Sequence, residues 1–272
     1  MFHKFLLGLF LVCGMFLSAT MSYAEETYDW TAVLALAEKG DAEAQFAMGS
    51  AYYQGAGVQQ DYKKAFEWFS KAAEQNNANA QFLLGVMYEE GEGVEQDYKK
   101  TFEWFTKVAE QDDPNGYFGL GSLYLNGFGV PVDYQKALEL YRKAAEKNSA
   151  EAQYNLGMMY EEGTGVEKDM QKAFEWYSKA AAQEDLDALF ALGAMYYDGN
   201  GVSQDYKKAL EYFTKSAEQG HVTAQYNLGV MYEEGQGTRQ NYTAAKEWYG
   251  KSCDGGDQTG CDNYAELNKQ GY

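Results

Sequence analysis

The side chains of this chain that could do chemistry are few, and they form no recognised catalytic set. Only one histidine, His221, lies beyond residue 24, so any Ser-His-Asp arrangement would have to use it, and no G-x-S-x-G turn is present. No serine is followed by a lysine three residues later, so the S-x-x-K signature of penicillin-recognising enzymes is also missing. We therefore expect no catalytic residues, and we interpret His221 as a residue at the start of a helix.

Three pairs of adjacent glutamates resemble the paired carboxylates of acid–base catalysts. They are Glu89–Glu90, Glu161–Glu162 and Glu233–Glu234. Each pair ends a predicted helix, so we interpret the pairs as solvated charge beside the solvent face of that helix. Calcium binding is the alternative, although the spacing does not match an EF-hand loop. We expect no metal and no cofactor.

An internal repeat of 36 residues positions these side chains. In six copies a glycine keeps this step, a tyrosine follows three residues later, and a G-x-G pair follows the tyrosine. The glycines are Gly49, Gly85, Gly121, Gly157, Gly193 and Gly229, and the tyrosines are Tyr52, Tyr88, Tyr124, Tyr160, Tyr196 and Tyr232. Several positions in phase over six copies indicate a repeat protein.

Each copy predicts a helix, a glycine turn and a second helix. In the first helix of the first copy, the residues that share one packing arc are Ala44, Gln45, Met48, Gly49 and Tyr52. The glycine on this arc is expected to allow close helix crossing, and the G-x-G pair to end the helix, because glycine adopts positive φ at little cost. Asp61 and its equivalents are expected to cap the second helix. That helix carries a wide stripe of small and aromatic residues, which copies must stack to bury.

The repeat resembles the Sel-one-like repeat family, a relative of the tetratricopeptide repeat. The matching residues of the fourth copy are Ala152, Leu156, Gly157, Tyr160, Gly163, Gly165, Val166, Asp169, Lys172, Ala173, Trp176, Tyr177, Lys179, Ala180 and Ala181. The resemblance covers about residues 40 to 265, and the third copy departs most, with Gly116 in place of alanine and Leu140 in place of tryptophan. The resemblance implies an all-α fold, a right-handed α-solenoid of stacked helix-turn-helix repeats, and a protein that is not an enzyme.

We expect four segments along the chain. Residues 1–24 have a positive start, an apolar run and small residues before position 25, which is typical of a secretory signal peptide cleaved there. An uncleaved anchor is the alternative. We interpret residues 25–40 as an N-terminal capping half-repeat, residues 41–256 as six repeats and residues 257–272 as a C-terminal capping helix. The expected localisation is the periplasm of a bacterium or its exterior, with no membrane insertion after signal removal.

Two cysteines remain beyond the signal segment, Cys253 and Cys261, and we predict a disulfide between them. An even number of cysteines in an exported chain favours pairing. In the repeat frame they lie on either side of the corner between a second helix and the next first helix. The Helicobacter cysteine-rich proteins, exported members of the family, have disulfides at this corner. Metal binding is the alternative, with a poor ligand set.

The composition is strongly acidic, with 22 basic and 41 acidic residues and a formal net charge of −19. This charge argues against binding nucleic acid or anionic lipid through a basic surface. An acidic surface that keeps the protein soluble explains the charge, and a preference for basic partners is the alternative. We expect a monomer that binds a protein or peptide partner.

In tetratricopeptide-like stacks the first helices line the concave side, so their residues outside the packing arc are candidates for binding a partner. These positions vary between copies, whereas the packing positions do not. We predict a groove at copies four to six, in which asparagines bond a peptide main chain, apolar side chains receive those of the peptide, and glutamates favour basic residues. The predicted residues are Asn155, Met158, Glu162, Asn227, Val230 and Glu234.

The leading hypothesis is an exported bacterial scaffold or adaptor that holds a protein segment in the concave groove. The resemblance to the Helicobacter cysteine-rich proteins leaves weak β-lactam binding or hydrolysis as an alternative, without support from the residues. An envelope regulator of a signalling protein and a purely structural envelope protein are further alternatives.

Overall fold

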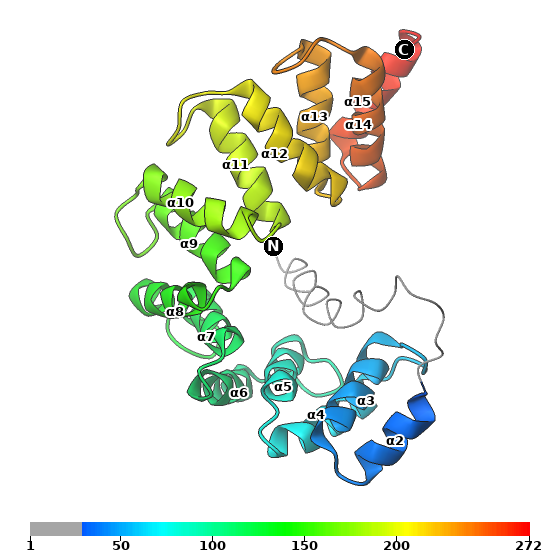
Figure 1. Cartoon of the computed structure of the whole chain (residues 1–272), viewed down its shortest axis with the longest axis vertical. Coiled ribbons are helices and arrows are strands. Elements are labelled where there is room, and N and C mark those ends of the chain that lie inside the picture. Colours follow the sequence, from blue (N-terminus) through cyan, green and yellow to red (C-terminus); the bar gives the residue numbers. More distant parts are fainter. Residues whose placement is uncertain (1–28) are drawn as a thin grey trace. The chain divides into compact units, whose positions relative to one another are not determined.

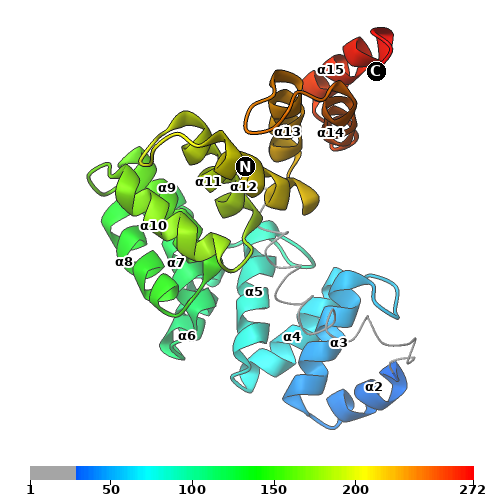
Figure 2. The same ribbon diagram turned by 45° about the horizontal axis from the view of Figure 1, so that its top comes forward.

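The computed structural model describes residues 29–272, so the predicted signal segment lies outside the described residues. This part of the chain is entirely helical, without a strand (Figure 1). The helices are α2 (Trp30–Glu38), α3 (Ala42–Gln54), α4 (Tyr62–Glu74), α5 (Ala78–Glu90), α6 (Tyr98–Glu110), α7 (Pro114–Asn126), α8 (Tyr134–Glu146), α9 (Ala150–Glu162), α10 (Met170–Ala181), α11 (Leu186–Asp198), α12 (Tyr206–Glu218), α13 (Val222–Glu234), α14 (Tyr242–Asp254) and α15 (Gln258–Lys269). Within each of the two compact units described below, consecutive helices pack in tandem (Figure 2), and the family match confirms the predicted all-α solenoid of repeats.

The described residues form two compact units. The N-terminal unit comprises residues 29–123 and 127–131, and the C-terminal unit comprises residues 124–126 and 132–272. Helix pairs α3/α4 and α5/α6 pack in the N-terminal unit, and pairs α9/α10, α11/α12 and α13/α14 pack in the C-terminal unit. In each pair the first helix and the second helix belong to one repeat.

Short polar signals set the helix ends, as the sequence predicts. The Asp169 side chain accepts a hydrogen bond from the Lys172 backbone N–H and so caps α10. Equivalent aspartates cap α4, α6, α8 and α12, and Asn241 caps α14. Helix α9 ends at Gly163, whose φ of 81° lies in the left-handed region. Two residues later, a Cβ on Gly165 would lie 2.9 Å from the carbonyl oxygen of Tyr134, so the turn passes too close to α8 for a side chain.

In α3, α5, α9, α11 and α13 the repeated glycine of the first helix lies against an aromatic ring of the second helix. A Cβ on Gly157 would lie 2.4 Å from Cε1 of Tyr177, and one on Gly193 would lie 2.5 Å from Cδ1 of Phe213. The same relation holds between Gly49 and Phe69. This confirms the expected close crossing, which offsets the helix propensity lost at glycine, roughly 1 kcal/mol relative to alanine.

A buried glutamine connects the helices of neighbouring repeats. Gln153 donates from Nε2 to the carbonyl oxygen of Ala145 at 3.2 Å, and its Oε1 accepts from Nε2 of Gln183 at 2.9 Å. It thereby joins the end of α8, the start of α9 and the turn that follows α10. We call this arrangement a glutamine bridge. Equivalent bridges are formed by Gln45 with Gln75 and by Gln81 with Gln111.

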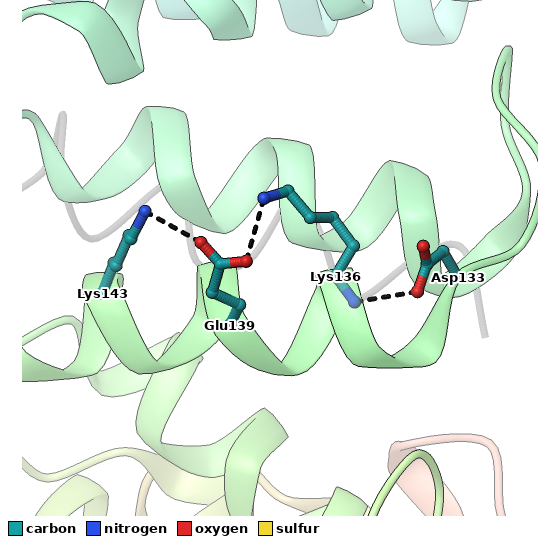
Figure 3. A network of polar contacts seen from close by, with 4 residues as sticks. All are labelled: Asp133, Lys136, Glu139 and Lys143. Carbon is teal, nitrogen blue, oxygen red and sulfur yellow. Dashed lines mark hydrogen bonds and ion pairs between the residues drawn. The ribbon is translucent and has the colours of Figure 1, made fainter.

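The exposed face of α8 carries a row of charged contacts (Figure 3). The Asp133 carboxylate accepts from the Lys136 backbone N–H at 2.9 Å, and Glu139 pairs with the ammonium groups of Lys136 and Lys143 at 2.9 and 3.0 Å. The hydrogen bonds from the two lysines lower the pKa of Glu139. Because these side chains are exposed, solvent screens the pairs and they stabilise the helix little.

The predicted disulfide is present and joins α14 to α15. Cys253 lies in the last turn of α14, Cys261 lies in the first turn of α15, and their Cα atoms are 4.5 Å apart. The link therefore holds the last helix to the helix pair before it.

Candidate functional site

The six residues predicted to bind a partner lie on two first helices of the C-terminal unit. Asn155, Met158 and Glu162 are on α9, and Asn227, Val230 and Glu234 are on α13. Helix α11 carries the corresponding positions of the repeat between them. Each trio follows one face of its helix, with the acidic residue in the last turn.

The first two members of each trio are less exposed than the sequence suggests. The Asn155 side chain donates from Nδ2 to the carbonyl oxygen of Glu151 at 2.8 Å, so it is partly used within its own helix. Met158 and Val230 are half-buried and pack against core clusters. In the second copy the equivalent Leu83 and Val86 are only 6% and 3% exposed. Neighbouring repeats therefore cover part of this face, although it lies outside the packing arc.

The acidic member of each trio is exposed. Glu162 accepts a hydrogen bond from the Thr164 hydroxyl at 3.2 Å, and Glu234 accepts one from Nε2 of Gln236 at 2.6 Å. Both donors are neutral, so these hydrogen bonds bring no positive charge to the carboxylates.

The first glutamate of each acidic pair has a different environment from the second. The Tyr177 hydroxyl donates to Oε2 of Glu161 at 2.6 Å, and the Tyr249 hydroxyl donates to Oε2 of Glu233 at 2.7 Å. Burial, and then the bonded carboxylate, raises the pKa of each tyrosine, so each hydroxyl stays protonated and keeps donating. The interpretation of both pair members as solvated charge is thus wrong for the first member. The Tyr177 and Tyr249 hydroxyls, found where copies one, two and five have phenylalanine, were the available signal in the sequence.

The two kinds of helix differ in the charge of their last turn. Every second helix carries a lysine there: Lys71, Lys107, Lys143, Lys179, Lys215 and Lys251. The first helices α3, α5, α7, α9, α11 and α13 carry no basic residue there. In the C-terminal unit they end instead in Glu161–Glu162, Asp198 and Glu233–Glu234. Because the helix dipole favours cations at a C-terminus, each such carboxylate costs about 0.3–1 kcal/mol.

His221 has the structural role expected of it. It is the N-cap of α13, where its Nδ1 accepts from the Ala224 backbone N–H at 3.1 Å. Its Nε2 lies 3.3 Å from a carboxylate oxygen of Asp187, and its ring stacks on Phe190. These contacts use both ring nitrogens to hold the corner between α12 and α13.

Other features of residues 29–272 do not add to the predicted groove. The described residues contain no group of three or more histidine, cysteine, aspartate or glutamate side chains placed to hold a metal. None of the helices in this range is long and apolar enough to cross a membrane. Two open hollows of the C-terminal unit lie elsewhere, one around Tyr196 and Lys208 and one around Leu189 and Tyr212.

The chain matches a known repeat family along most of its length. The Sel1 repeat model matches six times, at residues 42–77, 78–113, 114–149, 150–185, 186–221 and 222–257. These ranges contain every helix from α3 to α14. No curated protein matches the chain.

Several solved structures are similar. The protein c5321, a protective antigen present in uropathogenic Escherichia coli strains displaying an SLR fold, is 35% identical with a TM-score of 0.77, and the match covers 90% of this chain. The chain spans about half the length of that protein, 52%. A Sel1 repeat protein from Oxalobacter formigenes is 36% identical with a TM-score of 0.76, covering 79% of this chain and 89% of that one. Helicobacter pylori cysteine rich protein B is 32% identical over 47% of this chain and 92% of its own, with a TM-score of 0.39.

Proposed function

Because the chain belongs to the Sel1 repeat family, whose members are protein-interaction scaffolds, we propose that it is an exported bacterial scaffold that binds a basic segment of a partner protein. The binding surface is the row of first-helix ends in the C-terminal unit, formed by α9, α11 and α13. The partner segment lies across these helices and places its lysines or arginines beside their last turns.

The observation that carries this proposal is the reversed charge of the helix ends. Second helices have lysine in the last turn, which the helix dipole favours, whereas α9, α11 and α13 have glutamate or aspartate there. Residues that break a local stability rule in successive repeats are expected where function requires them. Cationic side chains of a partner would relieve the unfavourable interaction between the carboxylates and the helix dipole.

The tyrosines that bond the glutamates, and the asparagines, would make this charge attraction directional. Tyr177 and Tyr249 hold Glu161 and Glu233 in one orientation, so less side-chain entropy is lost on binding. The Asn155 amide oxygen is an acceptor for a peptide N–H, because its Nδ2 is the group that bonds within α9. Asn227 occupies the same position on α13.

The proposal also includes export from the cytoplasm, capping helices at both ends of the stack, and a monomeric state. A disulfide between Cys253 and Cys261 is typical of proteins in oxidising compartments, which supports action in the periplasm or outside the cell. Helices α2 and α15 would close the two ends of the stack as capping half-repeats. The net charge of −19 opposes association between copies, which supports a monomer.

The experiment compares two variants that carry the same change of charge at different positions of the chain. We would probe an array of short peptides of differing net charge with the purified protein and with Glu162→Lys/Glu234→Lys. The matched control is Glu175→Lys/Glu247→Lys, which makes the same charge change at exposed positions of α10 and α14.

We expect the wild type and the control to select basic peptides, with affinity that falls as salt rises, and the Glu162/Glu234 variant to lose that selection. Equal loss in both variants would indicate general charge attraction and would contradict the proposed surface. Selection of neutral or acidic peptides by the wild type would contradict the basic partner.

We propose no enzymatic activity. Members of this family are typically scaffolds without catalysis. Purified protein lacking residues 1–24 should therefore leave nitrocefin unhydrolysed, and sustained turnover that follows the protein through purification would revive the β-lactam hypothesis.

A further inference from the structure

A buried carboxyl group without a hydrogen-bond partner lies in the N-terminal unit. Glu89, near the end of α5, is 8% exposed, and its Oε2 atom is buried and unpaired. An unpaired ionised carboxylate in such a place is strongly unfavourable, so the group either finds a donor or stays neutral. Glu89 takes no part in the proposed binding surface, which lies in the other unit.

Two other repeats show what a carboxyl group at this position requires. Glu161 and Glu233 occupy the same repeat position as Glu89, and each accepts a hydrogen bond from a tyrosine 16 residues later. The residue 16 positions after Glu89 is Phe105, which has no hydroxyl group. Phe105 is fully buried and lies against Gly85, as Tyr177 lies against Gly157, so the ring keeps its place while the donor is lost.

The charges around Glu89 also disfavour its ionised form. On α5, the adjacent Glu90 is negative, and Glu92 in the following turn acts on Glu90 while it accepts from the Tyr53 hydroxyl at 2.6 Å. On α6, the neighbouring titratable group is Tyr98, and the pKa of its hydroxyl is raised by burial and then by the two glutamates.

The lysines of α4 and α6 do not compensate this charge. On α4, which packs on α5, Lys63 is exposed, Lys64 pairs with Asp61, and Lys71 lies 4.0 Å from the ring centre of Trp68. Lys99 and Lys100 lie in the first turn of α6, where Lys99 is exposed and the Lys100 ammonium is held 4.8 Å from the ring centre of Tyr88. Helix α7, whose Gly119 lies against Phe105, has no acidic or basic side chain. Burial, with the charge of Glu90 second, raises the pKa of Glu89 to about 7.

We propose that Glu89 makes the helix pair α5–α6 a pH-sensitive switch, closed while the carboxyl group is neutral and loosened when the group loses its proton. In the unfolded chain the group titrates near its ordinary value of 4.5. Because its pKa is raised in the folded protein, the stabilisation is complete below about pH 4.5 and is lost as the pH rises through about 7. The pair is therefore closed in acidic surroundings and weakest at alkaline pH.

The test uses substitutions that add or remove the missing hydroxyl group. Phe105→Tyr places a donor where Tyr177 and Tyr249 have theirs, and Glu89→Gln removes the titration. Tyr177→Phe is the reciprocal variant, because it removes the hydroxyl group that donates to Glu161, and so leaves that carboxylate without its tyrosine donor, as Glu89 is. The measurement is the urea midpoint of unfolding of each protein at about pH 5 and about pH 8.

We expect the midpoint of the wild type to fall from the lower to the higher pH by more than that of Phe105→Tyr or Glu89→Gln, and that of Tyr177→Phe to fall by the most. Burial raises the pKa of Asp185 to about 6 as well, so the differences between variants are informative and a single pH curve is not. The same fall in all four proteins would overturn the proposal.

A second measurement keeps the test decisive if a variant folds poorly. In protein with ¹³C-labelled glutamate, the carboxyl signal that is absent from Glu89→Gln belongs to Glu89. Its titration midpoint should lie near 7 in the wild type. A midpoint near the ordinary value of 4.5 would mean that the group is ionised without strain and would refute the switch.

Discussion

At the scale of single residues, the repeated glycine of α3, α5, α9, α11 and α13 marks a position where only a hydrogen atom fits. Glycine is a poor helix former, yet it recurs at this position because an aromatic ring of the second helix lies over it. The helix thus loses some local stability and gains close packing between the two members of a repeat. Gly250 of α14 differs from these glycines, because the atoms nearest to an added Cβ there lie 3.3 Å away.

Gly157→Ala should destabilise the protein although it improves helix propensity. The added Cβ would lie 2.4 Å from the Tyr177 ring, and overpacking of this kind costs about 1–3 kcal/mol. Urea unfolding measures the loss. The control is Gly250→Ala in α14, where the nearest atoms lie 3.3 Å away on Tyr264, an exposed ring that can move. Equal effects of the two substitutions would show that contact with the ring is not the reason why this position requires glycine.

At the scale of helices, glutamine bridges connect one repeat to the next, and the last bridge is incomplete. Gln225 donates to the carbonyl oxygen of Ala217 at 3.1 Å, but its own Oε1 is buried without a partner. The residue that would complete the bridge is Gly255, where other copies have glutamine or lysine. Copies three and five replace the bridging glutamine itself, with Tyr117 and Leu189.

Gln153→Leu should cost more stability than Gln225→Leu. The first substitution removes two hydrogen bonds and leaves Nε2 of Gln183 without its Gln153 partner, although the Ala145 carbonyl still accepts from the Asn148 backbone N–H. The second removes one hydrogen bond and one unpaired oxygen. We expect the difference to be about 1 kcal/mol in the free energy of unfolding. Urea unfolding of the two variants measures it, and a larger loss for Gln225→Leu would contradict the role assigned to the bridge.

The disulfide acts at the same scale, since it ties α15 to α14. Replacing Cys253 and Cys261 with alanine should lower the free energy of unfolding by about 2–3 kcal/mol, because the short closed loop restricts the unfolded chain. The check is a thermal melt of the wild type with and without reductant, beside the variant. Addition of reductant should leave the melt of the double-alanine variant unchanged. The prediction would be contradicted if the oxidised wild type and the double-alanine variant had the same melting temperature.

At the scale of the whole molecule, the acidic excess opposes the folded state. The formal net charge is −19, and folding brings these negative charges closer together, which increases the repulsion between them. Salt that screens this repulsion should stabilise the protein by about 1 kcal/mol, which raises the melting temperature by roughly 2–4 °C.

Thermal melts in increasing sodium chloride measure this shift. Potassium chloride should give the same shift if screening is the cause, and a specific effect of sodium would separate the two salts. A melting temperature that falls as salt rises would indicate that favourable ion pairs outweigh the repulsion.

The capping and turn residues were predictable from the sequence because their contacts are local. Asp169 bonds a backbone group three residues away, and Gly163 adopts its conformation within one turn. Cys253 and Cys261 were predictable as well, since they lie eight residues apart on either side of one corner. The candidate binding residues were chosen by helix position alone, which ignores what the neighbouring repeats cover.

The environments of Glu89, Glu161 and Glu233 depend on residues 16 positions away on another helix. Whether such a carboxylate is bonded or unpaired follows from one hydroxyl group on the facing ring. The periodicity of residue types along the sequence does not contain that information, because it assigns residues to the faces of one helix at a time.

By itself, the sequence determined the 36-residue period, the paired helices with their caps and turns, and the disulfide at the last corner. Each of these rests on interactions between residues close together in the chain. Tertiary structure alone decided which side chains of a first helix are covered by neighbouring repeats and which glutamates find a donor. The physical reason is that both outcomes depend on how close two helix surfaces approach each other, a distance set by the packing of all their side chains together.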